Sequence, residues 1–504
     1  MKLRKSLLTC AITFALGSSF AANANTDDKA QSSSELATQV TTLGVSNSII
    51  LDQVSVTGVG NEAVITQQGT GQRAETVSIG DGNMVQVNQA QTSNLSLIYN
   101  TGDFNDVAHT QNGTMNGALS ETVGNDNAIR VEQQGAGFFG INNEAINTVT
   151  GDENTITVTQ GDGGHWFYNF DLEGNSNTVS SEQVGLLNEA TFNTVIGDDN
   201  TIEVAQEGLF NAFTSDEIVG NGNDITIDQT GAFNSATLTS VRGDYNEVEL
   251  EQDGDSNTAL IAEVTGNDNE VKSDQEGNSN SFESAVLIGD GNTLLVNQKQ
   301  DGNTAGLDAI GNENELTAFQ NGNGNDVYLG AIGNDNEFVA NQIGDANSAH
   351  IANFNGNDNN VDIAQAGDEN TVLVQSSYPD TSLSSNDNDI AINQEGNLNE
   401  AALTFASVLD SNNNQVAFTQ VGELNAIDLI MEGSSNSVDI SQTGSENFVA
   451  GIGEGAFLLG GEGNSLVVVQ EGNANLVEGS MIGSNSTVVI TQLGDGNIAT
   501  VTQE

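Results

Sequence analysis

The 504-residue sequence is poor in cysteine, proline and basic side chains. It has one cysteine, one proline and nine Lys and Arg residues against 70 Asp and Glu, so its formal net charge is −61. Nucleic acid is therefore not an expected partner, because phosphate backbones are bound by basic residues. Few long helices are expected, since the abundant Asn, Ser, Thr and Gly residues compete with or weaken helical hydrogen bonds.

The N-terminus has the parts of a secretory signal peptide. Three of residues 2–5 are basic, residues 7–16 form an apolar stretch too short to span a bilayer, and Ala22-Asn23-Ala24 offers a small–x–small cleavage pattern. Cleavage after Ala24 would remove the only cysteine and leave 6 basic and 70 acidic residues, a net charge of −64. No later run of 18 apolar residues follows, so no transmembrane helix is expected.

Glutamines recur at a nearly constant spacing through most of the chain. Seven of them are 23 residues apart: Gln160, Gln183, Gln206, Gln229, Gln252, Gln275 and Gln298. Four earlier ones, from Gln67 to Gln133, are 22 apart, and eight later ones run from Gln320 to Gln492, which makes 19 copies. The clearest copies, such as that of Gln183, follow the pattern Q-x-G-x-x-N-x-A, with a G-x-x-N element before the next glutamine. A period of 20–50 residues predicts a stacked repeat architecture.

Each copy has two halves with the alternation of a β-strand that buries one face. In the first half, Asn154, Ile156, Val158 and Gln160 share one parity and threonines take the other. The G-x-x-N elements separate the halves, and Gly and Asn tolerate the positive φ of tight turns. Each copy therefore predicts strand–turn–strand–turn, with turn glycines at Gly185, Gly197, Gly208, Gly220, Gly231, Gly243, Gly254 and Gly266.

Inward Asn and Gln side chains would be costly to bury without partners. In an in-register stack, each amide can bond to the same amide one rung above and below, as in cross-β ladders. Besides the seven glutamines, the predicted ladder residues are Asn154, Asn177, Asn188, Asn200, Asn211, Asn223, Asn234, Asn246 and Asn257. The predicted fold is all-β: a β-solenoid or cross-β stack of about 19 rungs and about 90 Å in length.

Four copies are longer than 23 residues, and their extra residues are predicted to bulge as loops. These extra residues include 137–140, the stretch around Pro379 and residues 455–460. The predicted organisation is a signal peptide at 1–24, a flexible polar leader at 25–46 and a repeat region at 47–504.

The repeat resembles the curlin repeat of curli fibre subunits. Gln229-x-Gly231-x-x-Asn234-x-Ala236 matches it residue for residue, as does the period, and the resemblance covers roughly residues 47–503. It implies a secreted structural subunit or accessory of extracellular curli-like amyloid fibres, in the biofilm matrix and adhesion of a Gram-negative bacterium. The partners it implies are the chain itself or related curlin subunits, a periplasmic chaperone and an outer-membrane secretion pore, to which the leader would address the chain.

The chain departs from that family in three respects. Familiar curlins have only a few copies, and their second strand usually ends in Gln. Here the equivalent positions hold Thr194, Ser240, Glu263 and Val286, which predicts a weakened second ladder. In-register stacking of so acidic a chain would also align like charges unless cations screen them. A monomeric, acidic, cation-binding β-solenoid adhesin is therefore the alternative.

Acid-rich turns are the candidate calcium ligands, although no cofactor is predicted. Residues 151–154, 266–269 and 333–336 offer carboxylate and amide oxygens. The chain lacks the G-G-x-G-x-D repeat of calcium-binding β-rolls and the spacing of an EF-hand loop. A solvated turn chosen for its backbone geometry accounts for the same residues.

Motifs of catalysis are missing, and no enzyme is predicted. The G-x-G-x-x-G at residues 135–140 is not followed by an amphipathic helix, so it predicts no phosphate site. His109, His165 and His350 stand in different copies without partners at metal-ligand spacing. G-x-S-x-G and H-E-x-x-H do not occur. The aromatic run 165–170 is either a stacking surface for a sugar or partner, or a second strand with half its aromatics buried.

Overall fold

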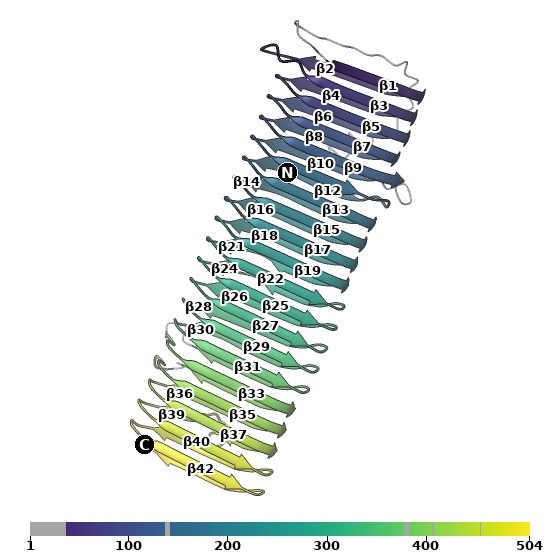
Figure 1. Ribbon diagram of the computed structural model, residues 1–504. Coiled ribbons are helices and arrows are strands. Elements are labelled where there is room, and N and C mark those ends of the chain that lie inside the picture. Colours follow the sequence, from purple (N-terminus) through teal and green to yellow (C-terminus); the bar gives the residue numbers. More distant parts are fainter. Residues whose placement is uncertain (1–36, 137–141, 377–382, 406–407, 454, 504) are drawn as a thin grey trace. The chain divides into compact units, whose positions relative to one another are not determined.

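The computed structural model describes residues 37–136, 142–376, 383–405, 408–453 and 455–503. The predicted signal peptide, the first part of the predicted leader, Gly137, Gly140 and Pro379 lie outside these residues. The chain divides into two compact units, Met1–Asn246 and Glu247–Glu504. All regular structure in the described residues is β-strand (Figure 1). These residues contain no helix long and apolar enough to cross a membrane.

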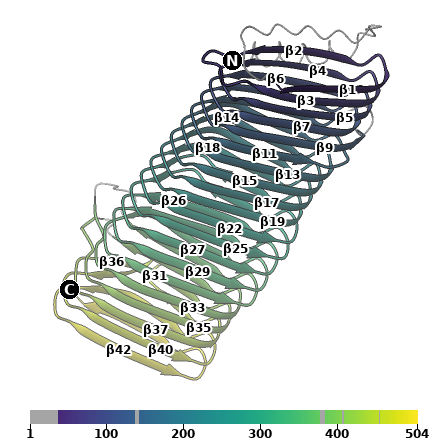
Figure 2. The same ribbon diagram turned by 45° about the horizontal axis from the view of Figure 1, so that its top comes forward.

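In each unit the chain alternates between two parallel sheets, called here sheet A and sheet B (Figure 2). One strand of sheet A, a turn, one strand of sheet B and a second turn make one rung. In the first unit, sheet A consists of β1 (Ala37–Val45), β3 (Glu62–Thr70), β5 (Met84–Thr92), β7 (Asp106–Thr114), β9 (Ala128–Ala136), β11 (Thr155–Gln160), β13 (Thr178–Leu186), β15 (Thr201–Leu209) and β17 (Asp224–Ala232). Sheet B consists of β2 (Ser48–Val54), β4 (Arg73–Ile79), β6 (Leu95–Thr101), β8 (Gly117–Val123), β10 (Glu144–Thr150), β12 (Trp166–Glu173), β14 (Glu189–Ile196), β16 (Ala212–Val219) and β18 (Ser235–Arg242).

The second unit has the same arrangement. Its sheet A consists of β19 (Glu247–Asp255), β22 (Glu270–Glu276), β25 (Thr293–Lys299), β27 (Glu315–Asn321), β29 (Glu337–Ile343), β31 (Asn360–Ala366), β33 (Asp389–Asn397), β35 (Gln415–Glu423), β37 (Ser437–Ser445), β40 (Ser465–Glu471) and β42 (Thr487–Leu493). Its sheet B consists of β20 (Thr258–Ile261), β21 (Val264–Thr265), β23 (Ser281–Ser284), β24 (Leu287–Ile288), β26 (Thr304–Ile310), β28 (Asp326–Ile332), β30 (Ser348–Asn355), β32 (Thr371–Ser376), β34 (Glu400–Phe405), β36 (Ala426–Glu432), β38 (Phe448–Ala450), β39 (Phe457–Gly460), β41 (Leu476–Ile482) and β43 (Ile498–Gln503).

Both units are parallel β-solenoids, which confirms the predicted fold class. Pairing joins equivalent residues of successive copies: Gln160 stands opposite Gln183, and Gln183 opposite Gln206. The alternation predicted for the strands is present, since Ile156 and Val158 are buried on β11 between threonines that are exposed or half-buried. The core lies between the two sheets and consists of such inward aliphatic columns, with aromatic rings added on some strands.

A β-bulge in sheet B explains why copies have either 22 or 23 residues. In β28, which belongs to a 22-residue copy, the inward residues Val327, Leu329 and Ala331 keep a strict period of two. In β14, which belongs to a 23-residue copy, Phe192 and Val195 are both buried although they are three residues apart. The extra residue of such copies is therefore absorbed inside the second strand.

The bulge overturns one prediction. Thr194 is only half-buried because it lies in the bulge, and the inward position passes to Val195. The same shift occurs at the other three positions expected in the second ladder. The residue that points inward is the next one along the chain, so Val241, Val264 and Leu287 are buried instead of Ser240, Glu263 and Val286. Hydrophobic burial thus replaces the second ladder in these copies.

Two further predictions are wrong in part. The leader was expected to be flexible over 25–46, yet β1 pairs in register with β3 along its whole length. Thr42 stands opposite Gln67 there, so the glutamine that marks a copy is missing. The loop expected at 455–460 is instead largely β39, in which Phe457 and Leu459 are fully buried and pair with β36.

Candidate functional site

The predicted ladder glutamines lie on the inward face of sheet A and are buried. Nε2 of Gln160 donates to Oε1 of Gln183 at 2.9 Å, and Nε2 of Gln183 donates to Oε1 of Gln206 at 2.9 Å. The same Nε2 of Gln160 also donates across the interior to the backbone oxygen of Glu144 on β10, at 3.0 Å. Each glutamine therefore ties one rung to the next and sheet A to sheet B. The remaining predicted glutamines make equivalent bonds: Gln206 to Gln229, Gln252 to Gln275, and Gln275 to Gln298.

The asparagines that close the G-x-x-N turns form a second buried ladder. Oδ1 of Asn154 accepts both the backbone N–H and the side-chain Nδ2–H of Asn177, each at 3.0 Å. Nδ2 of Asn177 also donates to the backbone oxygen of Gly197 in the following turn, at 2.8 Å. Further members repeat this pattern: Asn200, Asn223 and Asn246.

The asparagines of the other turn bond differently in the first unit. Oδ1 of Asn188 accepts the backbone N–H of Asn211 at 3.0 Å, whereas Nδ2 of Asn211 donates to the backbone oxygens of Glu207 and Gly231. Asn234 donates its backbone N–H to Asn211 in the same way. In the second unit Oδ1 of Asn257 accepts the backbone N–H of Asn280 at 2.9 Å. All four predicted asparagines are buried: Asn188, Asn211, Asn234 and Asn257.

The predicted turn glycines are required by the neighbouring rung as well as by their own turn. All eight have positive φ: Gly185, Gly197, Gly208, Gly220, Gly231, Gly243, Gly254 and Gly266. A Cβ added to Gly197 would lie 1.8 Å from the backbone oxygen of Gly220, and one added to Gly208 would lie 1.9 Å from that of Gly231. The stacked turns are so close that only a residue without a Cβ fits.

Another column in the first unit alternates asparagine and aspartate. From the turn of Asn125 onward, the residue after the turn glycine forms this column: Asn125, Asp152, Asn175, Asp198, Asn221 and Asp244. The two preceding turns depart from the alternation, because Asp81 and Asp103 are adjacent there. Oδ1 of Asp198 accepts the backbone N–H of Asn175 at 2.7 Å and its Nδ2–H at 3.0 Å, and Asp198 in turn donates its backbone N–H to Oδ1 of Asn221. Like charges are thus two rungs or about 10 Å apart, a distance beyond the screening length of about 8 Å at physiological salt.

The acid-rich turns use many of their oxygens in these ladders. Asn269 and Asn336 are buried ladder members, and Asn267 donates to Asp290 of the next rung. Asp268 and Asp335, the third residues of their turns, adopt positive φ. The described residues contain no group of three or more His, Cys, Asp or Glu placed to hold a metal.

One carboxylate has a role that the sequence did not reveal. Asp81 accepts hydrogen bonds from Ser55 Oγ at 2.6 Å and from the backbone N–H of Val56 at 2.8 Å, and it also bonds to Thr57. These bonds, with that to Ser55 foremost, lower the pKa of Asp81. The carboxylate thereby holds residues 55–59 against the stack. Its turn reads Gly-Asp-Gly-Asn, like other turns of the chain, so no local signal marks it.

The three histidines lie in separate places. His109 is fully buried on β7, with Nδ1 2.9 Å from Ser96 Oγ and Nε2 2.8 Å from Ser120 Oγ, and burial lowers its pKa to about 3. His165 is also buried, and its pKa is lowered to about 4, chiefly by desolvation. On the surface, His350 lies 2.8 Å from a carboxylate oxygen of Asp326, which raises its pKa.

The aromatic run forms β12 and has the alternation of a second strand. Phe167 is fully buried and packs on Phe192 with ring centroids 5.9 Å apart, while Trp166, Tyr168 and Phe170 are half-buried on the outer face. Tyr168 stacks on Phe170 at 5.5 Å and donates to Glu144 at 3.1 Å. Burial raises the pKa of both Tyr168 and Glu144.

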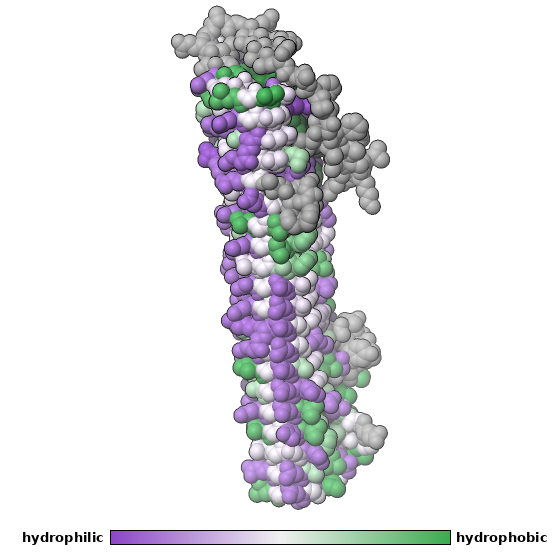
Figure 3. Space-filling view, turned by 90° about the vertical axis from the view of Figure 1, so that its right-hand side faces the viewer, coloured by the Kyte–Doolittle hydropathy of each residue, from purple (hydrophilic) through white to green (hydrophobic). Residues whose placement is uncertain are grey.

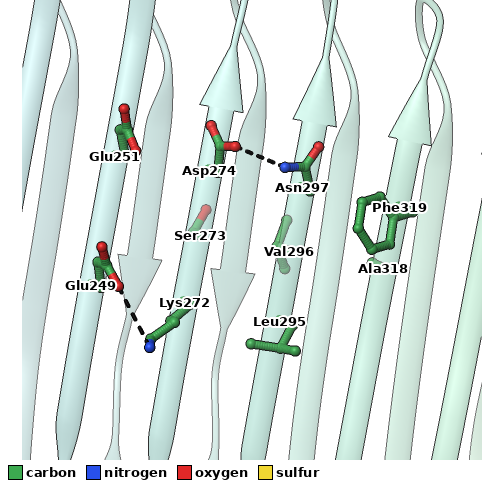
Figure 4. A pocket seen from close by; sticks show the side chains of 10 residues that line it. All are labelled: Glu249, Glu251, Lys272, Ser273, Asp274, Leu295, Val296, Asn297, Ala318 and Phe319. Atoms are coloured by element: carbon green, nitrogen blue, oxygen red, sulfur yellow. Dashed lines mark hydrogen bonds and ion pairs between the residues drawn. The ribbon is translucent and has the colours of Figure 1, made fainter.

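A shallow hollow of about 250 Å³ lies on the outer face of sheet A in the second unit (Figure 4). Lys272 on one side of it contacts Glu247 and Glu270 at 2.9 Å and Glu249 at 3.6 Å. Beyond Lys272, Asn297 donates to Asp274 at 2.7 Å. The residues that line the hollow are Glu249, Glu251, Lys272, Ser273, Asp274, Leu295, Val296, Asn297, Ala318 and Phe319. The lysine is held by three carboxylates, so the hollow has an acidic rim.

The outer surface repeats this polar character along the stack. On the face drawn in Figure 3, hydrophilic residues gather in runs that follow the stacking direction. In-register pairing places equivalent residues of successive copies side by side and so accounts for such runs. The face in view is an array of repeated groups.

The comparison with known families matches these rungs. The curlin associated repeat matches residues 174–208, 220–253, 243–277 and 311–344. The first match covers β13 and β14 and contains the ladder pair Gln183 and Gln206. No curated protein matches the chain significantly. The four matches show that the chain carries curlin-associated repeats.

Proposed function

We propose that the chain is a secreted structural protein, a subunit or accessory of extracellular curli-like amyloid fibres that serve biofilm matrix and adhesion. The observation that carries the proposal is the pair of buried amide ladders, Gln on sheet A and Asn at the turns, on a chain with curlin-associated repeats. Such ladders bond each rung to an identical rung, so they favour growth by adding further rungs. No enzymatic activity is assigned.

The last described rung supports growth from its outer edge. β42 pairs with β40 and β43 with β41. The inward residues Val488 and Ile490 of β42 are only half-buried, whereas Leu466 and Val468, their partners on β40, are fully buried. A rung from a second copy or a related curlin subunit would cover this surface and pair with the edge of β42.

The acidity of the chain is compatible with stacking in this proposal. From Asn125 to Asp244, the alternation of Asn and Asp in the turn column keeps like charges of that column apart, and Lys272 neutralises adjacent carboxylates in the second unit. Cations in the medium would screen what remains. Under this proposal, the charge that argued for a monomeric adhesin would be tolerated in a fibre when cations screen it.

Export completes the proposal. The basic and apolar N-terminal segment would direct the chain to the periplasm of a Gram-negative cell and be removed after Ala24. Like the family it resembles, the chain would then meet a periplasmic chaperone and leave through an outer-membrane pore to the cell surface. Calcium binding at the acid-rich turns is a separate proposal. It is tested by measuring whether the melting temperature depends on calcium.

Electron microscopy of the purified mature chain tests the proposal, with added salt, divalent cations and preformed seeds. Val488→Glu places a charge on the inward side of the open rung, and Val489→Glu, one residue on, places it on the exposed side as a matched control. We expect Val488→Glu to stop elongation and Val489→Glu to retain it, with both variants folded by circular dichroism. Particles of one fixed size for the wild type in every condition would refute the fibre and favour the adhesin.

A further inference from the structure

The interior of the first unit is polar in a place where that of the second is apolar. On sheet B, five inward side chains between β4 and β12 carry hydroxyl or amide groups: Ser78, Asn100, Thr122, Asn147 and Asn169. Each is at most 1% exposed. In the second unit, neighbouring strands of sheet B place Leu307, Leu329 and Ile351 inward at the middle of the strand.

These buried groups lack protein partners among the described residues. Both amide atoms of Asn100, Asn147 and Asn169 have no hydrogen-bond partner, and the same holds for the hydroxyls of Ser78 and Thr122. The glutamine ladder of sheet A is in contrast bonded from rung to rung over the same copies. A buried amide that bonds to nothing is expensive, and native proteins satisfy such groups almost always.

The register arranges the five residues in two columns, because Thr122 stands opposite Val149 and Asn147 opposite Ser120. Ser78 stands opposite Asn100, and Asn100 opposite Thr122. Asn147 stands opposite Asn169, one strand further along. Paired strands are about 4.8 Å apart, so adjacent polar groups are within reach of a single bridging water.

We propose that bound water molecules lie inside the first unit in two short files, one along Ser78, Asn100 and Thr122 and one along Asn147 and Asn169. Water fits the chemistry because both files offer donors and acceptors and no charge, and a buried water needs two to four polar partners. The second file ends at the next strand, where Phe192 fills the position opposite Asn169. The inference is independent of the proposed fibre.

Magnetic relaxation dispersion of ¹⁷O and ²H on the full mature chain counts such long-lived waters. The test variant is Asn147→Leu with Asn169→Leu, which removes four unpartnered amide atoms and makes the interior resemble that of the second unit. Asn193→Leu is the matched control, because Asn193 lies on the outer side of β14 and bonds to exposed Asp216.

We expect the double variant to lose on the order of two long-lived waters, since each buried water takes about three hydrogen bonds. The control should lose none. An unchanged dispersion amplitude in a folded double variant would overturn the proposal. If the variant does not fold, a crystal structure of the wild type decides: density for water beside Asn147 and Asn169 supports the file, and amides bonded directly to each other refute it.

Discussion

Lowering the pH from 8 to 4 should destabilise the first unit through one buried side chain, His109. The imidazole is enclosed between Ser96 and Ser120 and has a pKa of about 3, against an ordinary value of 6.5. In the unfolded chain the ring would be protonated below pH 6.5, whereas in the folded chain it stays neutral down to about pH 3. The unfolded state therefore binds the extra proton in this window, and stability is complete above pH 6.5 and falls as the pH is lowered towards 3.

The size of the effect follows from the two pKa values. Between pH 8 and pH 4, the free energy of unfolding should drop by about 3 kcal/mol, with a limit of about 5 kcal/mol at lower pH. Carboxylates also titrate near pH 4, so the wild type alone does not isolate the histidine. The comparison needs a variant without the ring.

His109→Val is the suitable variant, because valine occupies the same position on both neighbouring strands, as Val87 and Val131. Loss of the bonds to the serines lowers stability at every pH, whereas loss of the titration acts only below pH 6.5. Urea unfolding of both chains, followed by circular dichroism at pH 8, 6, 5 and 4, gives the difference between them. If that difference is the same at pH 8 and pH 4, burial of a neutral His109 is not a source of acid sensitivity.

Three other predictions test the ladders. Gly220→Ala should lower the free energy of unfolding by more than the roughly 1–2 kcal/mol of left-handed strain, because its Cβ would lie 1.8 Å from the backbone oxygen of Gly243. At Gly324 an added Cβ would have nothing within 4 Å, so Gly324→Ala should show the strain alone. Urea titration of both variants measures the difference. Gln298→Leu removes the ladder partner of Gln275 and Gln320 and should lower the free energy of unfolding by about 2–4 kcal/mol. Gln300→Leu, at an exposed position, should be nearly neutral. Equal shifts of the melting temperature in the two variants would count against the ladder. Asn221→Asp places three carboxylates in adjacent rungs and should lower the free energy of unfolding by about 1–2 kcal/mol at low salt. The lost stability should return in 1 M NaCl. Asn334→Asp, between Asn312 and Asn357, should show no such salt dependence.

The period and the alternation were enough to predict the rung and its ladders, because both are repeated at the same positions in every copy. β1 escaped notice since Thr42 replaces the glutamine that marks a copy. The bulge could not be foreseen from β14 alone, because Thr194 and Val195 fit either parity until packing against Leu172 selects the valine. The role of Asp81 depends on which loop meets which turn, and that is a property of the folded stack.

The close stacking of the turn glycines makes each copy depend on the identity of the next. A side chain introduced at Gly197 collides with the backbone of Gly220, and one at Gly220 with that of Gly243. The effect of a substitution on stability therefore depends on the turn of the next copy as well as on its own turn. Neighbouring copies cannot diverge independently at this position. Duplication or deletion of a whole rung leaves every such contact intact, so the chain can change its length more easily than it can change its pattern.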